Sequence, residues 1–171
     1  SWRNLKKMLA VIDSSSLIFA FRLAPLRDLL YSRFEKLLVP PEVYREVVED
    51  GKALGKPEVP AIENAFTARK LELSQQPKKL IDAALGSGEK QALAIALEKS
   101  LSLICDDRKA RVIGSALGVR ILPISAFILW GVKTKRLTRN NGIALLDSLV
   151  HQGYRLKLDA YLQITEHIKK S

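Results

Sequence analysis

Acidic residues follow two apolar segments that lie far apart in the sequence. Asp13 ends the segment MLAVID, and Asp106 and Asp107 come directly after LSLIC. Carboxylates gathered at one place suit hard divalent cations such as Mg²⁺, and such a metal lowers the pKa of a bound water until it can act as a nucleophile. Each acid also has a purely structural explanation, because Asp13 could begin a turn and Asp106 or Asp107 could cap a helix. Acids at the ends of two separate apolar segments favour the metal-site hypothesis.

Glu89 is a further candidate because it lies on the apolar side of a predicted helix at 88–99. It aligns at helical spacing with Ala92, Leu93 and Ala96. A carboxylate near the core needs a partner, since an unpaired buried charge is costly. The alternative is a first-turn acid that complements the helix dipole. That alternative explains the negative charge but not its inward direction.

Glu46 is a weaker candidate in a predicted helix at 41–50, which Gly51 is expected to end. It flanks an apolar stripe marked by Val43 and Val47 and could reach inward along the edge of that stripe. A charged helix face is usually solvated, and three other acids of the helix compete for the role: Glu42, Glu49 and Asp50.

The elements that would position these acids alternate along the chain. Strands are expected at 8–13, 36–39, 101–105 and 119–122, with 71–73 a short strand or an extended connection. The serines at 14–16 are expected to cap a helix over the apolar LIFAF that follows. Further helices are expected at 61–70, 78–84, 107–117, 124–135, 140–152 and 158–169. This alternation predicts an α/β fold of three layers, with a central parallel sheet of four to five strands. Ligands of such sheets bind at the carboxyl ends of the strands, where the aspartates stand.

Length and composition limit the class of protein. A chain of 171 residues fits one domain, with an α/β core at about 8–122 and a helical extension at 123–171. Its hydrophobic fraction of 47% and charged fraction of 27% are those of an ordinary globular protein. The only cysteine, Cys105, excludes an internal disulfide. We expect a cytoplasmic protein, because no apolar run is long enough to cross a membrane and the basic segment 1–7 does not lead into a cleavable signal peptide.

The net charge of +10 indicates a polyanionic partner. Basic residues without an intervening acid gather between Gly131 and Leu146, and three of them are predicted to bind nucleic acid: Lys133, Lys135 and Arg136. Arg108 and Arg111 are spaced so that both could clamp one phosphate. The alternative is that these cations only keep the protein soluble.

Four segments together resemble the acidic motifs of PIN-domain nucleases. In chain order they are VIDSSSLI, VPPEVYREV, GSGEKQALAIAL and SLICDDRKAR. The last two are similar to the GEAEAIALA-like and DDRRAR-like segments of one prokaryotic, toxin-like branch. The tail LLDSLVHQGYRLKLDAYLQI also resembles the extension of that branch, so the similarity covers nearly the whole chain.

The resemblance implies which residues act. The catalytic acids would be Asp13, Glu46, Glu89 and Asp107. The metal ligands would be Asp13, Glu89, Asp106 and Asp107, with Ser15, Asp106 and Arg108 in supporting roles. Glu89 departs from the pattern, because many relatives carry aspartate there and the extra methylene should shift the carboxylate.

The resemblance also implies an activity, namely Mg²⁺- or Mn²⁺-dependent cleavage of phosphodiester bonds, most often in single-stranded RNA. Many members of the family are toxins, so an antitoxin protein and a second copy of the chain are the protein partners to consider. The alternative is a PIN-like module that binds RNA or protein without cleavage. A phosphotransferase with Asp13 as nucleophile is disfavoured, because Ser15 stands where that chemistry needs a second aspartate. Tyr154 is expected to pack between helices.

Overall fold

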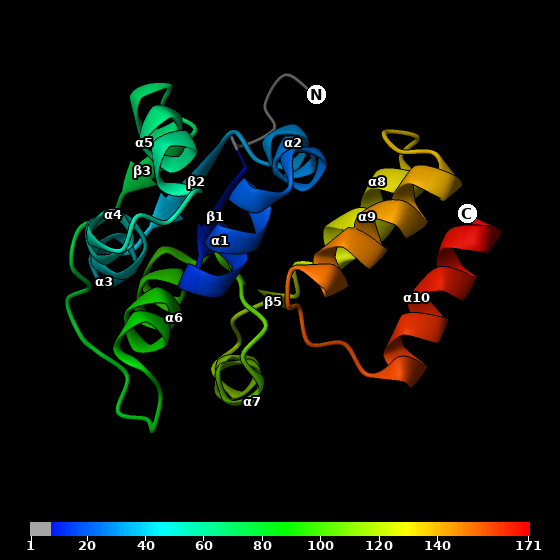
Figure 1. Ribbon diagram of the computed structural model, residues 1–171. Coiled ribbons are helices and arrows are strands. Elements are labelled where there is room, and N and C mark those ends of the chain that lie inside the picture. The colour runs from blue at the N-terminus through cyan, green and yellow to red at the C-terminus, as the bar shows by residue number, and fades with distance from the viewer. Residues whose placement is uncertain (1–7) are drawn as a thin grey trace, which may run out of the picture.

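The computed structural model describes residues 8–171 and has helices on both faces of a parallel sheet (Figure 1). The expectation concerning segment 1–7 lies outside these residues. Five strands form the sheet in the order β3-β2-β1-β4-β5. Their bounds are β1 Leu9–Ile12, β2 Lys36–Val39, β3 Leu71–Leu73, β4 Ser102–Ile104 and β5 Ile121–Leu122. The predicted α/β class with its parallel sheet is confirmed.

β1 lies at the centre of the sheet because its residues are apolar on both sides. Val11 pairs with Leu38 on β2 and with Leu103 on β4. Ala10, Val11 and Ile12 are fully buried, as is typical of parallel strands that are covered by helices. Since β1 and β4 are parallel neighbours, the acids that follow them reach the same edge of the sheet.

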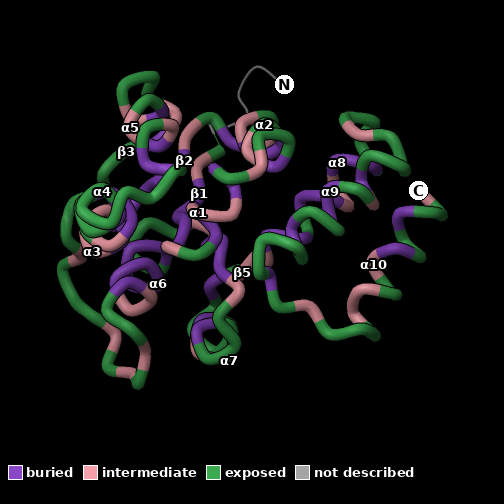
Figure 2. The backbone as a smooth tube through the Cα atoms, in the orientation of Figure 1, coloured by how far each residue is buried: buried purple, intermediate pink, exposed green. Residues whose placement is uncertain are grey.

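Alternate side chains of β1 pack into two cores, one on each face of the sheet. Ala10 and Ile12 belong to the larger core and Val11 to the smaller one. The larger core is covered by α1 (Ser14–Arg22), α2 (Ala24–Arg33), α5 (Val59–Thr67), α8 (Ala126–Lys133) and α9 (Arg139–His151). The smaller core lies under α6 (Ser87–Lys99) and α7 (Arg108–Ala116). Figure 2 shows buried positions along the strands and on the helix faces that turn toward them.

The helix expected at 41–50 is longer and less regular than predicted. It consists of α3 (Pro41–Tyr44), a π-helical turn η2 (Arg45–Asp50) and α4 (Gly51–Ala53). Gly51 does not end it, because Gly51 keeps helical dihedral angles. A Cβ at this position would lie 3.0 Å from Cγ2 of Val59, so the glycine allows close packing rather than termination.

The helix expected at 78–84 is absent, and this prediction is wrong. The segment between β3 and α6 is irregular. Ile81 and Leu85 pack against the smaller core, and the backbone N–H of Lys78 donates to a carboxylate oxygen of Glu98 at 3.0 Å. So few residues cannot offset the cost of helix nucleation without an apolar face of their own.

The end of the chain is helical, as expected. After α8 and α9, the helix α10 (Leu158–Lys170) packs against both of them and lies away from the sheet in Figure 1. Within residues 8–171 no helix combines the length and the hydropathy needed to cross a membrane.

Candidate active site

A cavity of about 730 Å³ opens at the carboxyl ends of β1 and β4. Four acids line it: Asp13, Glu89, Asp106 and Asp107. Asp13 follows β1, the other two aspartates follow β4, and Glu89 stands in the first turn of α6. The structure therefore brings together four acids that the sequence nominated, although they come from three separate segments.

Asp13 is the most buried of these acids, with 3% of its surface exposed. One of its carboxylate oxygens accepts from the backbone N–H of Ser16 at 3.0 Å, so Asp13 itself caps α1 instead of the serines that follow it. Its own backbone N–H donates to the carbonyl of Ile104 at 3.1 Å and ties the end of β1 to β4.

Burial raises the pKa of Asp13 to about 6, while hydrogen bonds with Ser16 and Cys105 lower it and the charge of Asp106 raises it further. No lysine or arginine within residues 8–171 forms an ion pair with Asp13. The charged form of this carboxylate is therefore destabilised in the folded protein. A bound cation would remove that cost, which makes Asp13 a suitable anchor for a divalent metal.

The raised pKa of Asp13 predicts that the metal-free protein loses stability as the pH rises from about 4 to about 6. Between the ordinary pKa of 3.8 and the folded value of about 6, the folded chain binds more protons than the unfolded chain, so the free energy of unfolding falls with rising pH. The loss from this group reaches up to roughly 3 kcal/mol. Urea unfolding in EDTA at several pH values measures it.

The matched variant is Asp13→Asn, which keeps the helix cap and removes the ionisation. Its unfolding free energy should depend on pH much less than that of the wild type. A smaller slope in the same direction should remain, because burial also raises the pKa of Asp106. Equal slopes in the two proteins would contradict the assignment.

Asp107 is exposed and caps α7, where one of its carboxylate oxygens accepts from the backbone N–H of Ala110 at 2.8 Å. Its other oxygen accepts no hydrogen bond from the part of the chain that the structure describes. The backbone N–H of Asp107 donates to Sγ of Cys105 at 3.4 Å. Cys105 is fully buried, as a small hydrophobic residue beneath the two acids, and burial raises its pKa. Asp107 thus keeps one oxygen available to the cavity.

Asp106 is held differently, because both of its carboxylate oxygens accept hydrogen bonds. The backbone N–H of Ile124 donates to one at 3.1 Å, and the hydroxyl of Tyr154 donates to the other at 2.5 Å. The same hydroxyl lies 3.2 Å from Oγ of Ser125, and the Tyr154 ring packs edge-on against Phe19 at 5.7 Å. Asp106 therefore fastens the C-terminal helices to the sheet.

Tyr154 is a residue whose role sequence reasoning missed. It was expected to pack between helices, which it does, but its hydroxyl is also the donor that holds Asp106. Burial and the charge of Asp106 raise the pKa of Tyr154, so the hydroxyl stays protonated. No signal in the sequence pairs the two residues, because they lie far apart along the chain.

Glu89 lines the cavity from the first turn of α6, beside Gly86. It is partly buried, and its carboxylate lies against Gly86, where a Cβ atom would collide with it. Gly86 is therefore needed for the carboxylate to fold back over the start of α6. The inward direction predicted for Glu89 agrees with its place in the lining.

Glu46 lies beside the cavity and outside its lining. It accepts a hydrogen bond from Oγ of Ser14 at 2.7 Å, and a Cβ on Gly88 would lie 3.1 Å from its carboxylate. It thus touches the immediate neighbours of Asp13 and Glu89. The π-helical turn that carries it is of a kind often found at functional sites.

The lining fits a divalent metal in its donors, although its side chains are not yet gathered around one point. Within residues 8–171, no three side chains of histidine, cysteine, aspartate or glutamate converge closely enough to hold a metal ion. Carboxylate oxygens are nevertheless the donors that Mg²⁺ and Mn²⁺ prefer. Asp13 and Asp107 are each held by a helix cap through one oxygen, and Glu89 lines the same cavity from α6.

Basic residues also line the cavity: Arg108 and Arg111 from α7, and Arg155 and Lys157 from the segment before α10. The sequence nominated the first two, and it nominated Ser15, which is exposed at the rim. Sequence reasoning missed Arg155 and Lys157, although the segment YRLK between two predicted helices indicates a loop with two basic residues.

The basic run at the end of α8 is not brought to this cavity. Lys133, Lys135 and Arg136 are exposed and outside its lining, and the Arg136 guanidinium lies 4.6 Å from the centre of the Trp130 ring. Its predicted contact with nucleic acid stays a prediction.

Comparisons with known proteins identify the family and a similar fold. A family model described as PIN domain (DUF3368) matches residues 9–170. Among solved structures, a PilT N-terminus domain protein from the hyperthermophilic archaeon Sulfolobus solfataricus is similar, with a TM-score of 0.50, 21% identity and coverage of 70% of this chain and 90% of that chain. No curated protein matches. PIN domains are generally nucleases, and those nucleases generally use divalent metals. Because the match spans nearly the whole sequence, the chain belongs to the PIN-domain family DUF3368.

Proposed function

We propose that this protein is a Mg²⁺- or Mn²⁺-dependent ribonuclease that cleaves single-stranded RNA. The proposal rests on one cavity that is lined by acidic and by basic side chains. Among the described residues, these acids and bases form no ion pairs with each other. The acids suit a divalent metal, and the cations suit phosphate. When bound, the metal would supply a water of lowered pKa and would stabilise charge on the leaving oxygen.

The chain's own residues have separate roles in this proposal. Asp13 is the fixed ligand, since its cap with Ser16 sets its direction. Glu89 and Asp107 complete the set from α6 and α7. Glu46 accepts a hydrogen bond from Ser14 in the first turn of α1. Because Ser14 follows Asp13 directly, Glu46 helps to position Asp13 in this proposal. Asp106 keeps the wall of the cavity in place.

The direct test is incubation of the purified protein with a fluorescein-labelled single-stranded RNA in millimolar Mn²⁺, with EDTA as the control. Cleavage in Mn²⁺ that stops in EDTA is the expected result. Parallel reactions with double-stranded RNA and single-stranded DNA identify the substrate. Binding without cleavage would instead favour a non-catalytic RNA-binding module.

Metal binding is also expected to stabilise the fold. The folded carboxylates hold Mn²⁺ while the unfolded chain does not, so metal at about 100 times its dissociation constant adds about 2.7 kcal/mol to the free energy of unfolding. The melting temperature should then rise by about 5 °C or more. Differential scanning fluorimetry of protein stripped with EDTA measures the shift.

Glu89→Gln is expected to remove most of this rise, because the amide keeps the shape and loses the charge. Glu49→Gln is the matched control, since Glu49 is exposed and outside the cavity lining. An equal rise in all three proteins would place the metal elsewhere.

A further inference from the structure

The segment that joins α9 to α10 presents two cations to the cavity. Gly153 turns the chain with a φ of +99°, and residues 154–157 then run without helix or strand until α10 begins. Tyr154 is buried, Arg155 exposed, Leu156 half-buried and Lys157 exposed. This alternation directs one set of side chains into the protein and the other outward.

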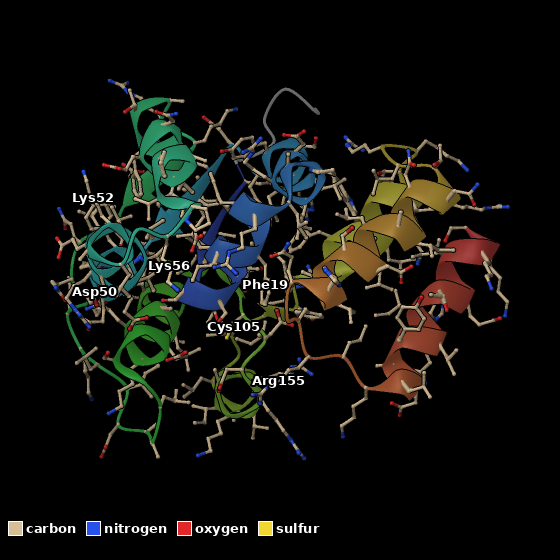
Figure 3. All side chains as sticks on the ribbon, viewed as in Figure 1. Phe19, Asp50, Lys52, Lys56, Cys105 and Arg155 are labelled. Atoms are coloured by element: carbon tan, nitrogen blue, oxygen red, sulfur yellow. The ribbon has the colours of Figure 1, made fainter. Side chains whose placement is uncertain are left out.

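The inward side chains fix the segment. The Tyr154 hydroxyl donates to Asp106, its ring packs on Phe19, and Leu156 packs against the larger core. Figure 3 shows Arg155 between α7 and the chain that leads into α10, below Phe19 and Cys105. Arg155 and Lys157 are thus exposed side chains on an anchored backbone and not on a loose loop.

The cations of the cavity are unpaired although four acids share it. Within residues 8–171, neither Arg155 nor Lys157 forms an ion pair, and neither does Arg108 or Arg111. Elsewhere in the fold a buried acid forms an ion pair with an arginine: Oε2 of Glu58 lies 3.3 Å from Nε of Arg22. In the described part of the chain, the cations that line the cavity therefore form no close ion pair with its acids, although burial raises the pKa of Asp106 and the charge of Arg111 lowers it in part.

We propose that Arg155 and Lys157 bind backbone phosphates of a single-stranded polynucleotide, from a segment of the chain separate from α7. The inference rests on the proposed function in taking RNA as that polynucleotide. Arg108 and Arg111 would contact phosphates from α7, and Arg155 and Lys157 would contact further phosphates from the segment before α10. Arginine suits this role because its planar guanidinium donates two parallel hydrogen bonds to a phosphate. The C-terminal helical extension is then part of the substrate site.

The test measures fluorescence anisotropy of a fluorescein-labelled single-stranded oligouridylate in EDTA, where no metal supports cleavage. The variant is Arg155→Glu with Lys157→Glu. It should bind at least about tenfold more weakly at physiological salt. The magnitude of the slope of log Kobs against log salt should also decrease by about 1.4, because each of the two lost phosphate contacts contributes about 0.7. The milder pair Arg155→Gln with Lys157→Gln should fall between variant and wild type.

The matched control is Lys99→Glu with Lys169→Glu, which makes the same change of net charge at two exposed positions outside the cavity lining. It should bind with nearly wild-type affinity. An equal loss in control and variant would show a net-charge effect and overturn the proposal. Melting temperatures of all variants should stay close to that of the wild type, because the replaced side chains are exposed. The control should lose slightly more, since its two lysines lie in the last turns of α6 and α10, where a cation complements the helix dipole.

The remaining outcomes separate this inference from the proposed function. If wild-type protein cleaves RNA in Mn²⁺ but the Arg155 and Lys157 reversal leaves affinity and slope unchanged, the inference fails and the nuclease function stands. If the reversal weakens binding while the wild type cleaves nothing in Mn²⁺, the phosphate contacts stand and the nuclease function fails. No binding of the oligonucleotide by the wild type overturns the inference.

Discussion

Replacement of Asp13 by asparagine is expected to slow RNA cleavage at least about 100-fold, the effect of losing an oriented metal ligand. Asparagine can still accept the hydrogen bond from Ser16 that caps α1, so the backbone at the end of β1 keeps its shape. It cannot supply the negative charge with which a carboxylate binds a divalent cation. Single-turnover rates in saturating Mn²⁺ measure the effect on the chemical step.

The same variant carries its own control for folding. Burial makes the ionised form of Asp13 costly, so the asparagine variant should unfold at equal or higher urea concentration than the wild type near neutral pH without metal. Loss of activity together with retained stability excludes unfolding as the cause. Asp28→Asn, at an exposed position on α2, should leave both quantities unchanged. Near-wild-type cleavage by Asp13→Asn would remove Asp13 from the mechanism.

The part of the site that lies on the sheet was predictable, because it follows from the strands. MLAVID and LSLIC are apolar enough to be buried strands, and parallel strands bring their carboxyl ends to one edge. Asp13 and Asp107 therefore had to be near each other once β1 and β4 were neighbours. Glu89 was predictable for a similar reason, since helical periodicity directs it to the apolar side of α6.

The helical C-terminal region was predictable as helices but not in its contribution to the site. Hydrophobic periodicity predicted the helices α8, α9 and α10. It does not predict which of the segments that connect them contacts the carboxyl edge of the sheet. Tyr154 reaches Asp106 through a contact between residues far apart in the sequence, and Arg155 and Lys157 enter the cavity only because Tyr154 is anchored there. Local pattern cannot reveal such pairs.

Local pattern also failed where tertiary contacts decide the backbone. Gly51 was expected to end a helix, but its lack of a side chain serves packing against Val59. The segment before α6 was expected to be helical, but it follows the surface so that Ile81 and Leu85 can pack. In both cases a contact with a distant element overrides intrinsic preference.

We expect the two adjacent aspartates after β4 to have different roles, Asp107 in cleavage and Asp106 in stability. Asp107→Asn should slow cleavage at least about 100-fold and change the free energy of unfolding little, because asparagine still caps α7 and only the metal-binding charge is lost. Asp106→Asn should instead lower the free energy of unfolding, because an amide cannot accept from both the Ile124 N–H and the Tyr154 hydroxyl. That loss is about 1–3 kcal/mol, and removal of the buried charge of Asp106 offsets only part of it. Urea unfolding and single-turnover cleavage on both variants make the comparison.

Tyr154→Phe decides whether Asp106 acts through its anchor or through a metal. Phenylalanine keeps the ring contact with Phe19 and removes only the hydroxyl that donates to Asp106. If Asp106 is a positioning residue, both variants should destabilise the protein, and Tyr154→Phe at least as much as Asp106→Asn, because it leaves the buried carboxylate without its hydroxyl donor. Their effects should also not add in the double variant, because both remove one interaction. Both variants should keep most of the melting-temperature rise in Mn²⁺, which Asp107→Asn should lose. Loss of that rise in Asp106→Asn while Tyr154→Phe retains it would make Asp106 a metal ligand as well.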